Sequence, residues 1–595
     1  MKSQRKRSFC FRIAFPLVLA FAIFIGASSA LAECWKFGVM GDTQWTIADD
    51  PAIQNQNGVA VSFINQVNQQ FINHGVKFVI QVGDLTENGN DADIATRAAA
   101  AQALYKAGIG FFPMRGNHET YGNPPNNFAI PAFQSNFPQT RGIAPTWGAT
   151  NFSSPTSVAL PPPYNALHEL DGMSYSFDYG SAGNKVRFVI IDNWVTPSMN
   201  FPNPDGYNYG YSIDYQQSWI SSRLDKDTRG TEHALVFSHQ PLMAENHQDS
   251  PFTGYTNANP AWQNAFFASL QLNGAKYVSG HDHIDQRSII TSPNGAFKVQ
   301  ELICASLSSK FYTPKPLVSG CTPSGMPAQP DCWFGQKRAE TSLSQERYTP
   351  GFYIFTIDGP RVTVDYYSDV TGNYASDRCY PNSVGSTPQS CPTSASDGSH
   401  ITPTFNFVKK ETWGYSLNGH EFLVAQGEPY TNVVDNFENT IARILGGKNG
   451  STAQDYNSRP LTKAVNTGWT DAVTWRNEFF QRLFKKPTFD FASNILTLWG
   501  MADLGTSDQT DVYTLSMTYD GLPLLKGDFG IATTDDSGKW VNAVDMNIGS
   551  SIKKFVAGPW KPEYGPGTYG VDLKTNTAWA VIDYNGDFAV GRFEK

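Results

Sequence analysis

The sequence has few charged residues and no excess of basic ones. Asp, Glu, Lys and Arg make up 16% of its 595 residues, and the formal net charge is -9 at pH 7. Such a surface offers little to a polyanion such as DNA, because phosphate backbones are bound through basic patches. Hydrophobic residues make up 40% of the chain, which excludes a disordered protein. The length exceeds what one core supports, so we expect two domains with insertions.

The apolar run near the N-terminus is short for a membrane span. It covers Ile13–Gly26, contains Pro16, follows the basic segment MKSQRKRS and precedes Ala30-Leu31-Ala32. This pattern indicates a secretory signal peptide over residues 1–32, with an A-x-A cleavage site before Glu33. An uncleaved membrane anchor is the alternative, which the short run and its proline disfavour. We therefore expect an exported protein, periplasmic or extracellular, with no membrane segment after cleavage.

Cysteines with zinc-finger spacing are absent from the sequence. Of the seven cysteines, Cys10 would leave with the signal peptide, so six remain. An even number of cysteines in an exported chain suggests disulfides. Sequence proximity favours Cys321–Cys332 and Cys379–Cys391, which leaves Cys34–Cys304, and other pairings stay open.

Several short apolar runs end at, or just before, polar residues that could bind a metal. Linked by helical segments, such runs suggest parallel strands buried on both faces. Ligands of such sheets gather beyond the carboxyl ends of the strands. The five runs are Lys36–Asp42 with Gln44 after it, Phe78–Asp84, Phe111–His118 with Asn117, His233–His239, and Lys276–Gly280 followed by His281, Asp282 and His283.

Helical periodicity fills the interval between the first two strands. Apolar residues of the segment Ile53–Gly75, among them Phe63, Val67 and Phe71, lie on one stripe of a helix. Gly75 is placed to end this helix, because glycine adopts the left-handed backbone common after a last turn. The first strand, this helix and the second strand together indicate an α/β domain.

The polar residues at the strand ends form a set of oxygen and nitrogen donors without a thiolate. Asp42 and Gln44 are two residues apart, as are His281 and His283, so each pair points to one side of an extended backbone. Asp84 has two carboxylate oxygens and can bridge two cations. This donor set suits two divalent or trivalent metal ions such as Mn, Fe or Zn. Two such metals can share a bridging hydroxide and polarise a phosphoryl oxygen.

These residues resemble the calcineurin-like metallophosphoesterase family. The resemblance covers Phe37–Asp285 and implies a four-layer αββα sandwich in which the strand ends carry the site. It depends on five blocks in the right order: Gly41-Asp42-x-Gln44, Gly83-Asp84, Gly116-Asn117-His118-Glu119, His239, and Gly280-His281-x-His283.

The resemblance also implies a role for each site residue. The first metal would be held by Asp42, Gln44, Asp84 and His283, and the second by Asp84, Asn117, His239 and His281. His118 resembles the family's histidine that protonates the leaving oxygen, a general-acid role.

Two positions depart from the patterns of the family and of its purple acid phosphatases. The family usually has histidine where Gln44 stands, and a neutral amide would hold the first metal less tightly or prefer Mn. Leu85-Thr86-Glu87 lacks the tyrosine of purple acid phosphatases, so a purple iron–tyrosinate centre is not expected.

Composition divides the rest of the chain. We expect a catalytic domain over residues 33–376, a Cys/Pro/Ser-rich linker over residues 377–404, and a smaller β-rich C-terminal domain of unknown role over residues 405–595. The aromatic residues of this last domain leave a surface- or carbohydrate-binding role open.

The sequence therefore predicts an exported di-metal phosphoesterase that acts on small phosphate mono- or diesters. The alternative from another class is a non-catalytic surface or matrix binding protein, in which the phosphoesterase fold is a scaffold and the C-terminal domain binds. A nuclease is a third interpretation, which the acidic balance opposes. The sequence leaves the native metals, the substrate and the oligomeric state open.

Overall fold

The computed structural model describes most of the chain beyond the N-terminus. The described residues are 34–45, 55–120, 129–159, 167–193, 213–246, 260–312, 314, 340–370, 404–437, 440–472, 489–501, 508–521 and 527–593. The expected signal peptide, and the expected linker except for Thr404, lie outside them. Among the described residues, no helix is both long enough and apolar enough to cross a membrane.

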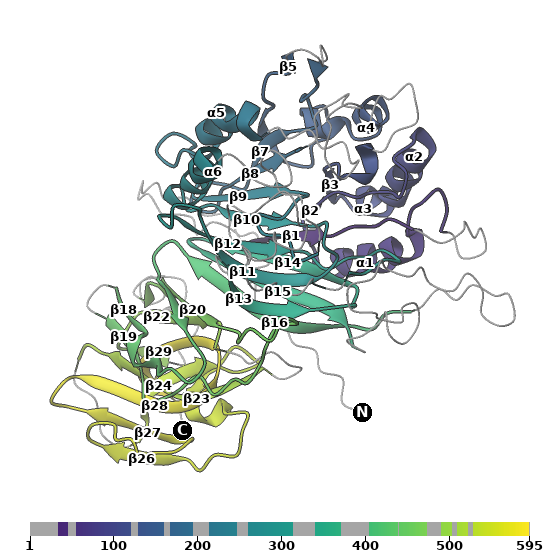
Figure 1. The fold of residues 1–595 in the computed structure, drawn as a ribbon. Helices are drawn as coiled ribbons and strands as arrows, with labels where there is room; N and C mark the ends of the chain where they lie inside the picture. The colour runs from purple at the N-terminus through teal and green to yellow at the C-terminus, as the bar shows by residue number, and fades with distance from the viewer. Residues whose placement is uncertain are drawn as a thin grey trace, which may run out of the picture.

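Two large sheets form the N-terminal part of the molecule (Figure 1). The six-stranded sheet has the order β16-β15-β14-β1-β2-β3, and the eight-stranded sheet has the order β13-β11-β12-β10-β9-β8-β7-β4. The strands of the first sheet are β1 (Trp35–Met40), β2 (Phe78–Gln81), β3 (Gly110–Pro113), β14 (Gly351–Asp358), β15 (Arg361–Asp369) and β16 (Phe407–Ser416). Those of the second are β4 (Thr150–Ser153), β7 (Tyr175–Tyr179), β8 (Val186–Ile191), β9 (His233–Ser238), β10 (Lys276–Ser279), β11 (Asp285–Thr291), β12 (Lys298–Ile303) and β13 (Glu340–Glu346).

The two sheets pack face to face around a core of aromatic and branched side chains. Phe37 and Phe78 of the first sheet contact Phe188 of the second, with ring centroids 5.1 and 5.2 Å from it. These residues belong to one buried cluster that also contains Leu235 and Phe237 of β9. Burial of this apolar area, worth about 25 cal/mol per Å², is what holds the sheets together.

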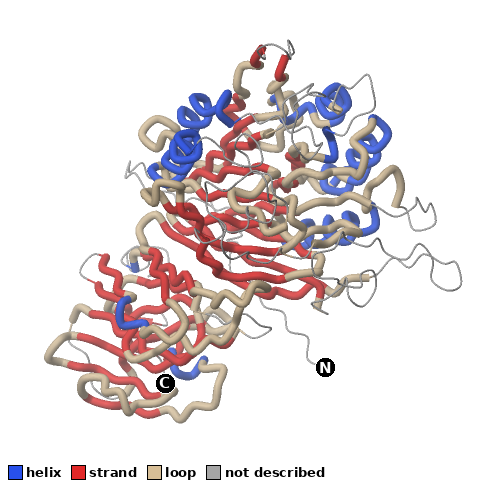
Figure 2. Tube along the Cα trace, viewed as in Figure 1, coloured by secondary structure: helices blue, strands red, loops and turns tan. Residues whose placement is uncertain are grey.

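Helices cover the outer faces of both sheets, so the predicted αββα layering is confirmed (Figure 2). The helices on the six-stranded sheet are α1 (Val61–His74), α2 (Asp91–Ala100), α3 (Gln102–Lys106) and α4 (Ile130–Asn136). Those on the eight-stranded sheet are α5 (Ile213–Leu224) and α6 (Pro260–Leu272).

The first helix shows where the sequence pattern was right and where it failed. Phe63, Val67 and Phe71 are buried on one face of α1, and Gly75 ends the helix with φ 66° as expected. The expected start at Ile53 was wrong, because α1 begins at Val61. Asn57 and Gly58 have φ angles of 51° and 62°, so they form a turn that a right-handed helix cannot contain.

The strands that carry the predicted site residues run parallel. β1 pairs with β2 and β2 with β3 in the first sheet. In the second sheet β8 pairs with β9, β9 with β10, and β10 with β12. The carboxyl ends of β1, β2 and β3 therefore lie at one edge of the first sheet, and those of β9 and β10 at one edge of the second.

The C-terminal part is β-rich, as predicted, and consists of two further sheets below the sandwich in Figure 1. Their inner faces share a core that includes Val465, Leu496, Leu515 and Ala580. One sheet contains β17 (Glu421–Val424), β20 (Lys463–Thr470), β21 (Phe489–Phe491), β22 (Ile495–Trp499), β24 (Phe529–Thr534), β25 (Trp540–Asn542) and β29 (Gly586–Phe593). The other contains β18 (Val434–Phe437), β19 (Thr440–Leu445), β23 (Gln509–Thr518), β26 (Lys554–Ala557), β27 (Thr568–Asp572) and β28 (Thr577–Tyr584).

Strand β16 belongs to the six-stranded sheet of the sandwich, although the expected domain boundary placed it in the C-terminal domain. It was assigned to the C-terminal domain, yet it pairs with β15 from Arg361↔Ser416 to Asp369↔Phe407 and completes the six-stranded sheet. A division based on composition does not detect this, because an edge strand is recognised by its hydrogen-bonding partner. The division of the chain into domains otherwise stays a prediction.

The expected disulfide between Cys34 and Cys304 is wrong. Cys304 is a free cysteine, fully buried in the core between the two sheets. Cys34 is disulfide-bonded, but not to Cys304. The other two expected pairs lie outside the described residues.

Candidate metal centre

The predicted site residues follow the carboxyl ends of five strands and meet where the two sheets face each other. Asp42, Asp84 and Asn117 come from loops after β1, β2 and β3 of the six-stranded sheet. His239 follows β9 directly, and His281 and His283 follow β10 of the eight-stranded sheet. One sheet supplies the oxygen donors and the other the nitrogen donors.

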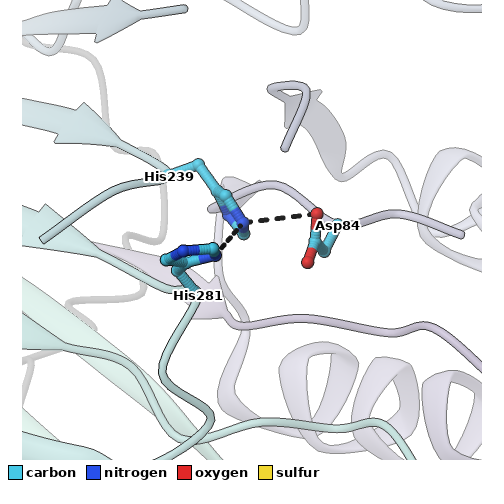
Figure 3. Close-up of side chains that lie close together, drawn as sticks. All are labelled: Asp84, His239 and His281. Carbon is cyan, nitrogen blue, oxygen red and sulfur yellow. Dashed lines mark hydrogen bonds and ion pairs between the residues drawn. The ribbon is translucent and has the colours of Figure 1, made fainter. Parts of the chain in front are cut away.

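The first group of donors surrounds the Nε2 atom of His239. This atom lies 3.2 Å from Oδ1 of Asp84, 3.0 Å from Oδ1 of Asn117 and 3.1 Å from Nδ1 of His281. Figure 3 shows Asp84, His239 and His281 pointing toward one another. The ligand atoms of these three residues all lie within 4.8 Å of one another, which suits a single cation.

The second group shares Asp84 with the first. Ligand atoms of Asp42, Asp84 and His283 also lie within 4.8 Å of one another. Nε2 of His283 is 3.4 Å from Oδ1 of Asp42. Gln44 lies at the same place, because its Nε2 donates a hydrogen bond of 2.8 Å to Oδ2 of Asp84.

The donor set fits two metal ions. It consists of carboxylate, amide and imidazole donors, and both groups use Asp84. The buried Oε1 atom of Gln44 has no hydrogen-bond partner among the described residues. A buried carbonyl oxygen without a partner costs free energy, and a cation would satisfy it.

Backbone carbonyls fix the orientation of three imidazoles. Nδ1 of His239 donates to the carbonyl of Val82 at 2.7 Å, and Nδ1 of His283 donates to the carbonyl of Lys310 at 2.5 Å. Nδ1 of His118 donates to the carbonyl of Glu87 at 2.6 Å. Since a carbonyl only accepts, the proton sits on Nδ1 and Nε2 remains available as a ligand or proton carrier.

Two glycines let the loops approach closely enough to form the site. A Cβ atom on Gly116 would lie 2.1 Å from Oδ1 of Asp84 and 2.8 Å from Nε2 of His239. Gly83 has φ 93°, and a Cβ atom there would lie 2.4 Å from Nδ1 of His239. The glycine in each of these two motifs is therefore required by the packing of its neighbours.

Three site residues adopt a left-handed backbone. The φ angles are 44° at Asp84, 73° at His281 and 54° at His283. Non-glycine residues in this region cost free energy and cluster at functional sites, because the surrounding structure must hold them there.

The electrostatics of the site favour positive charge. Burial raises the pKa of Asp84, but His239 and His118 override this and hold that pKa well below its usual range. Burial lowers the pKa of His239, whereas the Asp84 carboxylate raises it to about 10. His239 therefore carries a second proton at neutral pH, and a metal has to displace this proton to bind. Metal affinity should decrease as pH decreases.

All eight predicted site residues are thus brought together, including His118, whose Nε2 lies 3.8 Å from Oδ2 of Asp84. Sequence reasoning assigned no role to Glu119, although it is in the Asn117 motif. Its buried carboxylate accepts hydrogen bonds from the backbone N–H of Gly116 at 2.8 Å and of Thr86 at 3.0 Å, which ties two loops of the site together. Burial and the Asp84 carboxylate raise the pKa of Glu119 to about 8.

A buried ion pair beside the site was also not predicted from the sequence. Arg115, next to Gly116, donates from Nε to Oδ2 of Asp192 at 2.7 Å, and both side chains are fully buried. Asp192 directly follows β8 of the other sheet, so this ion pair crosses the sandwich beside the site. No local motif reveals it, since the two residues are 77 positions apart.

The layers and the two donor groups define a metal-dependent phosphoric ester hydrolase with two metal ions. Residues 36–285 match the model of the calcineurin-like phosphoesterase family, the family that the sequence motifs resemble. No curated protein sequence matches the chain.

The chain is also similar to several solved structures. A dimetal phosphatase from Danio rerio has 15% identity and a TM-score of 0.32, and the match covers 56% of this chain and 95% of that one. A purple acid phosphatase from seeds of yellow lupin (Lupinus luteus) has 13% identity and a TM-score of 0.33, covering 56% and 51%. The protein TT1561 of Thermus thermophilus has 8% identity and a TM-score of 0.25, covering 47% and 93%.

Proposed function

We propose that this protein is an exported phosphoesterase that hydrolyses small phosphate mono- or diesters. The observation that carries the proposal is that two groups of buried donors share the single carboxylate of Asp84. In the proposed assignment Asp42, Gln44, Asp84 and His283 hold one metal, and Asp84, Asn117, His239 and His281 hold the other. The donor types suit Mn, Fe or Zn.

When bound, the metals supply Lewis-acid polarisation of a phosphoryl oxygen and an activated water. The residues of this chain hold that arrangement and move one proton. Hydrogen bonds to Val82 and Lys310 aim the Nε2 atoms of His239 and His283. His118 acts as the general acid, because its Nδ1 is occupied by the Glu87 carbonyl while Nε2 faces the site.

A phosphate-release panel tests the function. Purified protein is assayed with added Mn²⁺ on a monoester, a diester and a nucleoside diphosphate, with and without a chelator. We expect chelator-sensitive release from at least one class. Asp84→Ala should abolish this release, and the exposed-site control Asp536→Ala should not. His118→Asn should lower kcat by about a hundredfold while the metal content stays unchanged.

The same experiment separates the enzyme from a binding scaffold. A chain that retains no metal and releases no phosphate from any class would contradict the proposal and favour the non-catalytic alternative. Metal content distinguishes the enzyme from the scaffold even when the natural substrate is missing from the panel, because a binding scaffold needs no bound metal.

Export is the second element of the proposal, and its support is the basic and apolar N-terminal pattern. Cleavage at the A-x-A site predicts a mature chain that begins at Glu33. N-terminal sequencing of the protein recovered outside the cytoplasm checks this, and an intact N-terminus there would contradict it.

A further inference from the structure

The C-terminal part reaches the sandwich through the loop between β19 and β20. The backbone N–H of Thr462 donates to the carbonyl of Ser342 at 2.9 Å, and that of Tyr456 donates to Oε1 of Gln345 at 2.7 Å. Both acceptors belong to β13, the end strand of the eight-stranded sheet. The loop therefore covers a sheet edge that would otherwise present unpaired backbone groups.

Arg459 of this loop is surrounded by three carboxylates. Its guanidinium contacts Oε2 of Glu340 at 2.7 Å, Oδ2 of Asp455 at 2.5 Å and Oε1 of Glu245 at 3.2 Å. The three carboxylate side chains are at most 1% exposed. Burial opposes the charge of Arg459, but Glu340 and Glu245 override it and raise the pKa of Arg459. Such a buried network is held in one geometry, because a misplaced partner leaves an uncompensated charge.

Glu245 connects this network to the metal centre. It belongs to the segment Gln240–Asn246, which continues directly from the ligand His239. The backbone N–H groups of Glu245 and Asn246 both donate to Oδ2 of Asp282, the second at 3.1 Å. Asp282 is fully buried and stands between the ligands His281 and His283.

The two histidines beside Asp282 need such support. Both have positive φ angles, a conformation that persists only where the surroundings hold it. Asp282 is anchored by the segment Gln240–Asn246, and that segment is anchored by Arg459. Two consecutive contacts, from Arg459 to Glu245 and from Glu245 to Asp282, therefore lead from the C-terminal part to the residue between two of the proposed ligands.

We propose that Arg459 is a positioning residue of the metal centre. By holding Glu245, it fixes the N–H groups that donate hydrogen bonds to Asp282. In this way it sets the placement of His281 and His283. The inference depends on the ligand assignment of the proposed function. It gives the C-terminal part a role in metal binding that neither its composition nor its core indicates.

The test compares two arginines that both bridge the sandwich and the C-terminal sheets. Arg361 on β15 contacts Thr497 at 2.8 Å and Asp587 at 3.7 Å, and its contacts do not include the segment Gln240–Asn246. Full-length Arg459→Lys and Arg361→Lys are compared with wild type by Mn²⁺ titration calorimetry and by metal retained after dialysis against a weak chelator. Lysine keeps the charge but loses the forked geometry that reaches several carboxylates.

We expect Arg459→Lys to raise the Mn²⁺ concentration for half-saturation about tenfold, as for other residues that orient metal ligands, and Arg361→Lys to leave it unchanged. Glu245→Gln should produce the same shift, and the double variant should show no further increase, because both changes break one chain of contacts. If Arg459→Lys does not fold, Glu245→Gln carries the comparison alone.

Unchanged Mn²⁺ affinity in both the Arg459→Lys and Glu245→Gln variants, with only a lower Tm, would overturn the inference and leave Arg459 as a clamp between the two parts. An equal loss of affinity in Arg361→Lys would overturn it as well. A wild-type chain that retains no metal would contradict the proposed function itself, and this inference with it.

Discussion

The two sheets of the sandwich contribute different chemistry to one site. The six-stranded sheet supplies Asp42, Asp84 and Asn117, and the eight-stranded sheet supplies His239, His281 and His283. Each donor group draws on both sheets, so neither sheet holds a metal position alone. The contrast shows that the metal centre depends on how the sheets pack: a change in their spacing would separate oxygen from nitrogen donors before it unfolded either sheet.

The largest effect is expected when the donor shared by both metal positions is removed, and the comparison is with the loss of an unshared donor. Asp84→Asn removes the carboxylate common to both groups, whereas His283→Ala removes one nitrogen donor. We expect Asp84→Asn to lose both metals and about a thousandfold in kcat/KM, the scale of a central electrostatic group. His283→Ala should retain one metal.

Metal content by elemental analysis, measured beside phosphate release, checks this first comparison. Equal metal content in the two variants would show that Asp84 is not shared between the positions.

A second change disturbs the contact between the sheets without removing a donor. In Gly116→Ala the new Cβ atom would lie 2.1 Å from the Asp84 carboxylate and 2.8 Å from His239, so oxygen and nitrogen donors must move apart. We expect metal affinity to fall about tenfold to a hundredfold with the circular dichroism spectrum unchanged. Gly565→Ala is the matched control, because a Cβ atom there meets nothing within 4 Å. Wild-type affinity in Gly116→Ala would show that the close approach is unnecessary.

The donor residues and the layers of the fold could be predicted because their signals lie in short stretches of the sequence. Asp42, Asp84 and His239 stand in short local motifs at the ends of apolar strands, so the sequence indicates both the donors and the edge where they gather. The αββα layers follow from the same strand and helix patterns. The glycines of these motifs were not interpreted from the sequence, and only the structure shows the close approaches at Gly83 and Gly116.

The remaining errors and omissions concern features that no local sequence motif shows. Arg459 and Glu245 lie 214 positions apart and stand in no motif. Cys304 was paired by elimination, which cannot show that its thiol is buried in the core between the sheets. The start of α1 was placed too early because periodicity continues through a turn that only the backbone angles of Asn57 and Gly58 reveal.

The smallest effect concerns pH and the stability of the eight-stranded sheet. His233 begins β9, donates from Nε2 to the carbonyl of Gly359 at 2.8 Å and is 1% exposed. Burial lowers its pKa from the usual 6.5. As pH falls through about 6.5, the unfolded chain binds this proton and the folded chain does not, so the free energy of unfolding decreases until the folded histidine is also protonated.

The variant His233→Gln should therefore show a shallower loss of stability than wild type between about pH 8 and pH 5. Urea unfolding in the presence of a chelator measures this without a contribution from metal release. A steeper loss in the variant would show that the imidazole gains, rather than avoids, a proton in the folded state.

Strand β16 has a practical consequence for anyone who divides this protein. A fragment that stops at residue 405, where composition changes, would remove the outermost strand of the six-stranded sheet and open the hydrogen-bonding side of β15 to other molecules. Such a fragment should oligomerise or precipitate during expression, whatever the state of its metal ligands. A cut after Ser416 keeps that strand in place, but it removes Arg459 and the loop that covers the edge of β13, so the full chain is the better material for work on the metal centre.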